Sequence, residues 1–285
     1  MDVLAFLSPP LLTHLRVVLG AGHTLVVARS WDEVVQLVRH RVVDVLVLDP
    51  AADGAIRSAE ILTIGALYPT QPVILYLALS PGSLRAVVEL ARHGVSQVVL
   101  HRFDDDAARF RTLLGQQHDI AIVDAALAAL LGPVSALTVP LARAVRRLFE
   151  RPHRFWTAQD LALEAAMPRR TMYRELTAAG FTSPRRLVLG ARLLRAYGYL
   201  REPGYFVADV VTKLGYGSAR VLVRHTRELV GATPSMLRDG VTEAEFVARL
   251  IAGILSPDLD TAVTAPRRRR ARRTEPPARD GRTEE

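Results

Sequence analysis

Two short stretches of the chain place arginines at helical spacing. The first, PRRTMYREL, begins at residue 168, and the second, SARVLVRHTREL, begins at residue 218. A guanidinium group is a planar fork of N–H donors that matches both a phosphate and the edge of a guanine base. Arginines on the outer face of a short helix therefore favour contact with a nucleic acid.

Each stretch follows a short apolar helix and a tight turn. In the first unit, Thr157 and Asp160 form an N-cap pair, and Pro168 is expected at the first position of the second helix. In the second unit, the turn GYG at 215–217 precedes Ser218, which is the expected N-cap. This order of elements is typical of a helix–turn–helix, whose second helix enters the major groove of DNA.

The spacing of apolar residues assigns an inner face to each second helix, with Met172 and Leu176 in one and Leu222 and Leu229 in the other. Positions on the remaining faces are the candidates for DNA contact: Arg169, Arg170, Thr171, Tyr173, Arg174, Ser218, Arg220, Val223, Arg224 and Arg227. The principal contacts, whether to bases or to phosphates, are expected from Arg169, Arg170, Arg220 and Arg224.

A helix predicted over residues 184–200 separates the two units. It spans roughly 25 Å at about 1.5 Å per residue. Successive major grooves on one face of DNA lie about 34 Å apart. The pattern therefore predicts that one chain reads two consecutive grooves without forming a dimer.

The net charge of +8 is concentrated in the same segment. Residues 151–238 contain 15 basic and 6 acidic residues, and the charges on either side nearly balance. An excess of this kind in one domain favours a polyanionic partner. The alternative is that the arginines only solvate a helical bundle, but the repeated unit and the local charge favour double-stranded DNA.

The first half of the chain alternates between strand-like and helical patterns. Apolar runs occur at 3–7, 24–28, 43–49, 73–78 and 97–101, with helical spacing near 11–19, 31–41, 55–68, 83–93 and 104–117. This alternation predicts an α/β fold with a doubly wound, parallel, five-stranded sheet, followed by an all-α domain. The expected divisions are a sheet domain (1–118), a helical linker (119–150) of one or two helices interrupted at Gly132 and Pro133, a DNA-binding domain (151–240), a helix (241–256) and a disordered basic tail (257–285).

The segment 155–238 resembles the DNA-binding domain of AraC/XylS-type transcription regulators. The resemblance depends on DLALEAAMPRRTMYREL, on SPRRLVLGARLLRA with Arg192 and Ala196, on VVTKLGYGSARVLVR and on the closing GATPSMLR. It implies two helix–turn–helix units. Ala166 stands where the family usually has Gly, and Thr226 stands at a usual aromatic core position.

The order of elements in the first half resembles a response-regulator receiver domain. VDVLVLDP places Asp49 at the end of the third strand, where receivers carry the phospho-accepting aspartate. Receivers also use an acidic pair after the first strand and a lysine after the fifth, whereas this chain has Ser8 and Pro9, and His101. A lone carboxylate is a poor Mg²⁺ site. A degenerate pseudo-receiver, which acts by dimerisation or by binding a partner, is therefore expected.

Other kinds of site are not indicated. The chain contains no cysteine, which excludes disulfides and thiol catalysis. The eight histidines show no HxxxH or HExxH pairing, so no metal site is predicted. No catalytic constellation, cofactor motif, signal peptide or membrane span is expected, and a cytoplasmic, nucleoid-associated protein follows. The run PRRRRARR at 266–273 either grips phosphates or is a solvated tail.

The sequence thus predicts a non-enzymatic, DNA-binding transcription regulator controlled through a receiver-like domain without phosphorylation. A homodimer through the N-terminal domain or the linker helices is compatible with it. One alternative is a two-component response regulator with Asp49 as the phospho-acceptor. Another is a nonspecific DNA-compacting protein driven by the basic tail.

Overall fold

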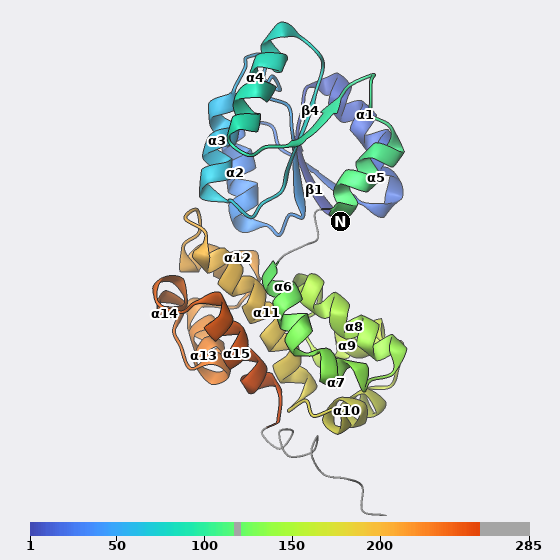
Figure 1. The fold of residues 1–285 in the computed structure, drawn as a ribbon, viewed down its shortest axis with the longest axis vertical. Coiled ribbons are helices and arrows are strands. Elements are labelled where there is room, and N and C mark those ends of the chain that lie inside the picture. Colours follow the sequence, from blue (N-terminus) through green and yellow to red (C-terminus); the bar gives the residue numbers. More distant parts are fainter. Residues whose placement is uncertain (117–120, 257–285) are drawn as a thin grey trace, which may run out of the picture.

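The computed structural model describes residues 1–116 and 121–256. Two units follow one another along the chain, an α/β unit at the top of Figure 1 and an all-helical unit below it. The five strands are β1 (Asp2–Phe6), β2 (Thr24–Val27), β3 (Val45–Leu48), β4 (Val73–Leu77) and β5 (Gln97–Leu100). Each lies within a run that the sequence predicts as a strand, or within one residue of it, and the predicted fold class is confirmed.

All five strands are parallel, in the order β2-β1-β3-β4-β5. This is the flavodoxin-like order of doubly wound sheets, which receiver domains share. The central strand β3 is buried along its whole length, because helices cover both faces of the sheet. The carboxyl ends of the strands therefore meet at one edge, where ligands bind in folds of this kind.

Helices α1 (Pro9–Leu19) and α5 (Ala107–Gln116) cover one face of the sheet, and α2 (Trp31–His40), α3 (Ser58–Leu67) and α4 (Pro81–Arg92) cover the other (Figure 1). Alternate side chains of each strand point to opposite faces. Val45 and Val47 accordingly belong to the core beneath α1 and α5, whereas Leu46 and Leu48 belong to the larger core on the other face.

The helix starts follow local capping rules. At the start of α2, Ser30 and Glu33 stand three residues apart, a spacing that predicts a capping box. The Ser30 hydroxyl accepts a hydrogen bond from the Glu33 backbone N–H at 3.2 Å. The Glu33 carboxylate accepts from the backbone N–H of Arg29 rather than that of Ser30, at 2.7 Å. The return bond of the capping box is thus displaced by one residue, to a donor before the helix, and the pair still satisfies the free Glu33 N–H of the first turn.

The helical unit contains α6 (Ala121–Ala129), α7 (Leu131–Ser135), α8 (Val139–Glu150), α9 (Ala158–Glu164), α10 (Arg169–Ala178), α11 (Pro184–Arg201), α12 (Val207–Lys213), α13 (Ala219–Val230), α14 (Pro234–Asp239) and α15 (Glu243–Ile254), with a short 3₁₀ turn at Pro152–Arg154. A further 3₁₀ turn, Gly20–Gly22, lies between α1 and β2 of the α/β unit. Gly132 and Pro133 lie inside α7 and do not interrupt a longer helix. Pro133 is tolerated there because the first turn of a helix needs no backbone donor. Helices α6 and α8 pack against α15, α11 and α9.

The two units contact each other through α2 and α12. The Nζ of Lys213 donates hydrogen bonds to the carbonyl oxygen of Arg41 at 2.7 Å and to the hydroxyl of Tyr205 at 2.8 Å. It also donates to the carbonyl of Val38, to which the Tyr205 hydroxyl donates at 3.2 Å. The last turn of α2 therefore gives its unpaired carbonyls to the helical unit, as helix C-termini require.

A second contact joins the end of α3 to the loop after α11. The backbone N–H of Gly204 donates to the carbonyl of Leu67 at 2.9 Å. A Cβ at Gly204 would lie 2.3 Å from the ring of Tyr68, so only glycine allows this approach. The Thr70 hydroxyl donates to the carboxylate of Glu202.

These contacts lie at the amino edge of the sheet, because α2 and α3 each end where the chain turns back into the next strand. Asp49 follows β3 and lies at the opposite, carboxyl edge. The docked edge of the α/β unit is therefore not the edge at which receivers are modified.

Candidate nucleic-acid interface

The first helix–turn–helix unit is formed by α9 and α10. Asp160 accepts a hydrogen bond from the backbone N–H of Thr157 at 2.8 Å, and the Thr157 hydroxyl accepts from Asp160 N–H at 3.4 Å. This capping box is the one that the sequence predicts. Met172 and Leu176 are fully buried, which leaves the opposite face of α10 towards solvent.

The turn of this unit contains a strained residue. Ala166 has a φ of 49°, in the left-handed region that disfavours residues with a Cβ. This backbone angle explains why the AraC-type domains that the segment resembles usually have Gly at this position. Pro168 is the N-cap of α10 rather than its first residue, and the helix spans Arg169–Ala178, the range that the sequence predicts.

The second unit is formed by α12 and α13. Leu222 and Leu229 are buried beneath α13, as predicted. Ser218 occupies the N-cap position, but its hydroxyl makes no capping hydrogen bond. It is exposed, so the hydroxyl remains available to a partner molecule.

The turn of the second unit is closed by an aromatic ring. Gly215 has a φ of 63°, and a Cβ on it would lie 2.1 Å from the indole of Trp156. Trp156 lies just before the first unit, so its ring joins the beginning of one unit to the turn of the other. Glycine is required at this position both by the backbone angle and by the ring.

The candidate contact residues lie on outward faces of α10 and α13. Six arginines are exposed: Arg169, Arg170, Arg174, Arg220, Arg224 and Arg227. Thr171, Tyr173 and Val223 are half-buried beside them. Arg169 lies over the Tyr173 ring, 5.6 Å from its centroid. In the part of the chain that the structure describes, none of the six forms an ion pair with a carboxylate.

Helix α11 connects the units and is the most enclosed of the elements around them. It has 18 residues, which corresponds to about 27 Å. Arg192, on its inner side, is only 5% exposed. Its guanidinium donates to the carbonyl of Leu214 and lies 4.2 Å from the Trp156 ring centroid and 4.9 Å from that of Tyr216. One buried cation thus contacts the ring that precedes the first unit and the turn of the second unit from the connector (α10 and α13 flank α11 in Figure 1).

The closing motif GATPSMLR also has a structural role. The Thr233 hydroxyl caps α14 by accepting from Met236 N–H at 3.3 Å. Arg238 donates to the backbone carbonyl of Leu200 at 3.1 Å and to that of Tyr205. This arginine therefore fixes the end of α11 and is not part of the exposed set.

Asp49 is 3% exposed at the carboxyl end of β3. Its Oδ1 accepts a hydrogen bond from the backbone N–H of Ala51 at 2.9 Å. Burial raises the pKa of Asp49, and the hydrogen bonds from Ala51 and Ser8 oppose that rise only in part. The carboxyl group is consequently harder to ionise than an exposed aspartate, and a phospho-acceptor must be ionised to act as a nucleophile.

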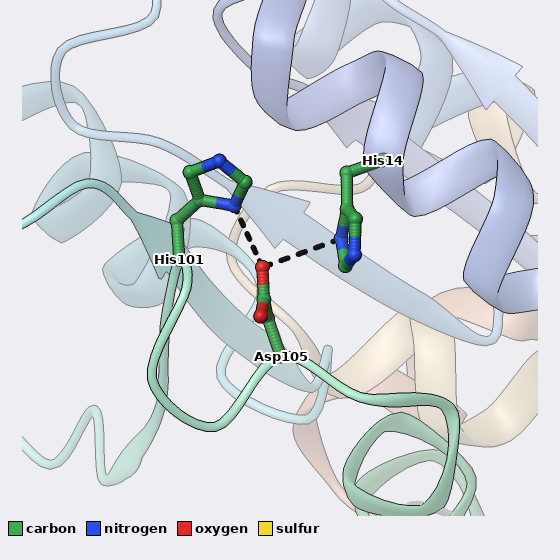
Figure 2. Close-up of side chains that lie close together, drawn as sticks. All are labelled: His14, His101 and Asp105. Atoms are coloured by element: carbon green, nitrogen blue, oxygen red, sulfur yellow. Dashed lines mark hydrogen bonds and ion pairs between the residues drawn. The ribbon is translucent and has the colours of Figure 1, made fainter.

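A further polar cluster lies beneath α1 and was not indicated by the sequence. The Tyr76 hydroxyl lies 2.9 Å from Nδ1 of His14, 2.9 Å from Nδ1 of His101 and 2.8 Å from Oδ2 of Asp105. Figure 2 shows both imidazoles turned towards the carboxylate of Asp105. Burial would raise the pKa of Asp105, but hydrogen bonds from Tyr76, the Arg102 backbone and His101 hold it below its usual value. Burial also raises the pKa of Tyr76, which stays a neutral phenol.

Comparison with known proteins addresses the helical unit directly. Residues 161–240 match a family model described as a helix-turn-helix domain. These residues are an AraC-type helix–turn–helix domain. The match covers the two units, α11 and α14. Together with the receiver-like sheet, it supports a DNA-binding regulator.

Two solved structures show weaker likeness. Full-length FixJ from B. japonicum is 17% identical, with a TM-score of 0.37 and coverage of 79% of this chain and 94% of its own. NtrX from Brucella abortus, in complex with ADP, is 17% identical, with a TM-score of 0.36 and coverage of 57% of this chain and 40% of its own. Both likenesses are too distant to carry an argument about function. No curated protein matches the sequence significantly.

Within residues 1–116 and 121–256, no helix combines the length and apolar character needed to cross a membrane. The basic run at 266–273 lies outside the described residues. The same is true of the whole predicted tail from residue 257.

Proposed function

We propose that this protein is a transcription regulator that binds specific duplex DNA with α10 and α13 in successive major grooves. The observation that carries the proposal is the pair of exposed arginine faces on the units that α11 connects, with Arg192 buried between them. Among the residues that the structure describes, these arginines form no ion pair. Because Arg192 is shared by both units, the spacing of the two recognition helices is fixed before DNA binds. Preorganisation of this kind lowers the entropic cost of binding two sites at once.

The arginines have separate roles in this proposal. Arg170 on α10 and Arg224 on α13 are the candidates for base contacts, where a bidentate guanidinium discriminates by about 1–3 kcal/mol per base pair. Arg169, Arg174, Arg220 and Arg227 are candidates for phosphate contacts, which position the protein but carry no sequence information. Ser218 and Thr171 add hydroxyl donors at the helix starts.

Selection from a randomised duplex library at moderate salt tests the proposal. The wild-type chain is expected to enrich a site with two blocks about one helical turn apart. Arg170→Ala/Arg224→Ala should abolish that enrichment. The matched control is Arg85→Ala/Arg92→Ala on α4, which removes the same charge far from the helix–turn–helix units and should leave the site unchanged.

Binding without enrichment, falling steeply with salt, would instead mean phosphate attraction alone. Deletion of residues 257–285 distinguishes the source of that attraction. A DNA-compacting protein driven by its tail loses binding on deletion, whereas the proposed regulator keeps its sequence preference.

Regulation through the receiver-like unit is proposed to work without phosphorylation. The support is the buried Asp49, which has Ser8 and no acidic pair beside it, and the docking of α12 on the amino edge of the sheet. A two-component regulator is the alternative. A gain of one phosphoryl mass after acetyl phosphate and Mg²⁺, lost in Asp49→Ala, would establish that alternative.

The same proposal includes a homodimer through the N-terminal unit or the linker helices, in the cytoplasm at the nucleoid. Dimerisation would place four recognition helices on one operator, so the selected site would contain two copies of the two-block motif. Sedimentation of the free protein and the copy number of the motif test this point together.

A further inference from the structure

The cluster around Asp105 brings together three side chains that are ligands of metals. His14 lies on α1, His101 directly follows β5, and Asp105 lies in the loop that leads into α5. One ligand atom from each of the three side chains, an imidazole nitrogen or a carboxylate oxygen, lies within 4.8 Å of the other two. Figure 2 shows the two rings approaching the carboxylate from separate elements, so the arrangement depends on the tertiary fold.

The donor set suits a zinc-class ion. Two imidazoles and one carboxylate occur in zinc sites that keep a fourth position for water. With metal–ligand bonds of about 2.0–2.2 Å, ligand atoms of a tetrahedral site are about 3.4 Å apart. Oδ2 of Asp105 lies 3.3 Å from Nδ1 of His14 and 2.6 Å from Nδ1 of His101. Of these two pairs, only the second must separate, by somewhat less than about 1 Å, to admit an ion.

The hydrogen bonds in the cluster compete for one atom. His14, His101 and Tyr76 all converge on Oδ2 of Asp105. A phenol has a single proton and can donate to only one acceptor. If Tyr76 donates to Asp105, it fixes the carboxylate, and a cation among the three ligand atoms takes the place of the two histidine–aspartate contacts. Orientation of a ligand carboxylate by a neighbouring donor is typical of protein metal sites.

The cluster is also accessible. The His14 side chain is 35% exposed, and those of His101 and Asp105 are 18% and 12% exposed. An ion can therefore enter beside His14 and retain a water molecule on that side. The cluster is enclosed on its inner side by Tyr76 and Phe110, whose rings lie 5.2 Å apart.

We propose that His14, His101 and Asp105 bind one divalent transition-metal ion of the zinc class, with Tyr76 as a positioning residue. The ion joins α1 to the loop before α5, two segments that both cover the same face of the sheet. It therefore stabilises the receiver-like unit by linking elements about 90 residues apart in the sequence. This inference is independent of the proposed DNA binding, and either can fail without the other.

Zinc titration of the full chain, free of any purification tag and stripped with a chelator, tests the inference. Competition with a chromogenic chelator should give one Zn²⁺ per chain and a higher unfolding temperature. Bound Co²⁺ should show the intense visible absorption of a tetrahedral site. His14→Ala and His101→Ala should each weaken binding by more than about 100-fold, and Tyr76→Phe by about 10–100-fold.

His93→Ala is the matched control, because His93 is exposed at the end of α4 and its Nδ1 contacts only the carbonyl of Glu89. It should bind zinc as the wild type does. If circular dichroism shows that His101→Ala does not fold, His14→Gln, at the more exposed position, is compared with the wild type and with His93→Ala instead. A wild-type chain that binds no stoichiometric zinc, or binding that survives in His14→Gln, overturns the inference and leaves a hydrogen-bonded network.

Discussion

The two helix–turn–helix units have the same plan but different surroundings. In the first, the turn carries Ala166 at a positive φ and is exposed. In the second, the turn carries Gly215 beneath the Trp156 ring, and its first helix packs against α2 of the receiver-like unit. Helix α9 packs against α8, α10 and α11 instead. Among the described residues, the first unit thus packs mainly within the helical domain, and the second also carries the contact through which the sheet domain can act.

The largest effect is expected from a substitution in the turn beneath the Trp156 ring. Gly215→Ala places a Cβ against Trp156 at a left-handed backbone position, so it should lower the free energy of unfolding by about 2–4 kcal/mol. Urea unfolding measures the change. Gly217→Ala is the control, since a Cβ there meets nothing within 4 Å and its φ is not positive. Equal effects at the two positions would contradict the role of the indole.

Removing the shared cation should uncouple the two units. Arg192→Met keeps the side-chain length but loses the charged hydrogen bond to Leu214 and the two ring contacts, with an expected cost of about 2–3 kcal/mol. Binding to a two-block DNA site should fall more than binding to either block alone. Arg185→Met, at an exposed position of the same helix, should change neither the free energy of unfolding nor the ratio of two-block to single-block binding.

The stability of the protein should depend on pH through Lys213, at the contact between α12 and α2. Burial lowers the pKa of Lys213 to about 7, so from about pH 7 upwards the folded protein releases this proton while the unfolded chain keeps it. The unfolded state then binds more protons, and stability rises with pH, by at most about 1.4 kcal/mol per pH unit. The charge of Arg195 also lowers the pKa of this amine, whereas that of Glu202 raises it.

Unfolding measured between pH 7 and pH 9 tests this, because the neighbouring tyrosines Tyr199 and Tyr205 have raised pKa values and stay neutral in that range. Lys213→Met should flatten the slope. A wild-type stability that falls over this range would show that Lys213 stays fully charged when docked.

The smallest expected effect is a gain in the free energy of unfolding from a substitution in the turn of the first unit. Ala166→Gly relieves the left-handed strain but adds chain entropy to the unfolded state, so a net stabilisation of about 0.5–1 kcal/mol follows. Ala125→Gly, at an exposed position within α6, should instead destabilise by a similar amount. A loss of stability in both variants would contradict the strain at Ala166.

The local elements could be predicted because their signals are local. Continuous apolar runs mark β3 and β4, and the pairs Ser30–Glu33 and Thr157–Asp160 mark helix starts through contacts three residues apart. The inner faces of α10 and α13 follow from helical spacing in the same way. The resemblance to AraC-type domains also identified Ala166 as unusual, although only the structure shows the backbone angle involved.

Features that depend on distant segments could not be predicted. In the sequence, Lys213 has the pattern of an ordinary solvated cation at the end of a short helix, but it is buried against carbonyls of α2. His14 is 87 residues from His101, and nothing local connects them. The only short-range signal was the spacing of four between His101 and Asp105, which is too common among exposed residues to indicate a site.

The docking of α12 on α2 also has a consequence for synthesis of the chain. Val38 and Lys213 are 175 residues apart, so at about 5–20 residues per second the ribosome needs about 9–35 s to make the second after the first. All five strands are complete long before then. From the completion of β5 at Leu100, about 6–23 s pass before Lys213 is made. During that time the nascent sheet domain has the carbonyls of Val38 and Arg41 and the ring of Tyr68 facing water, and chaperones have their best access to it at that edge.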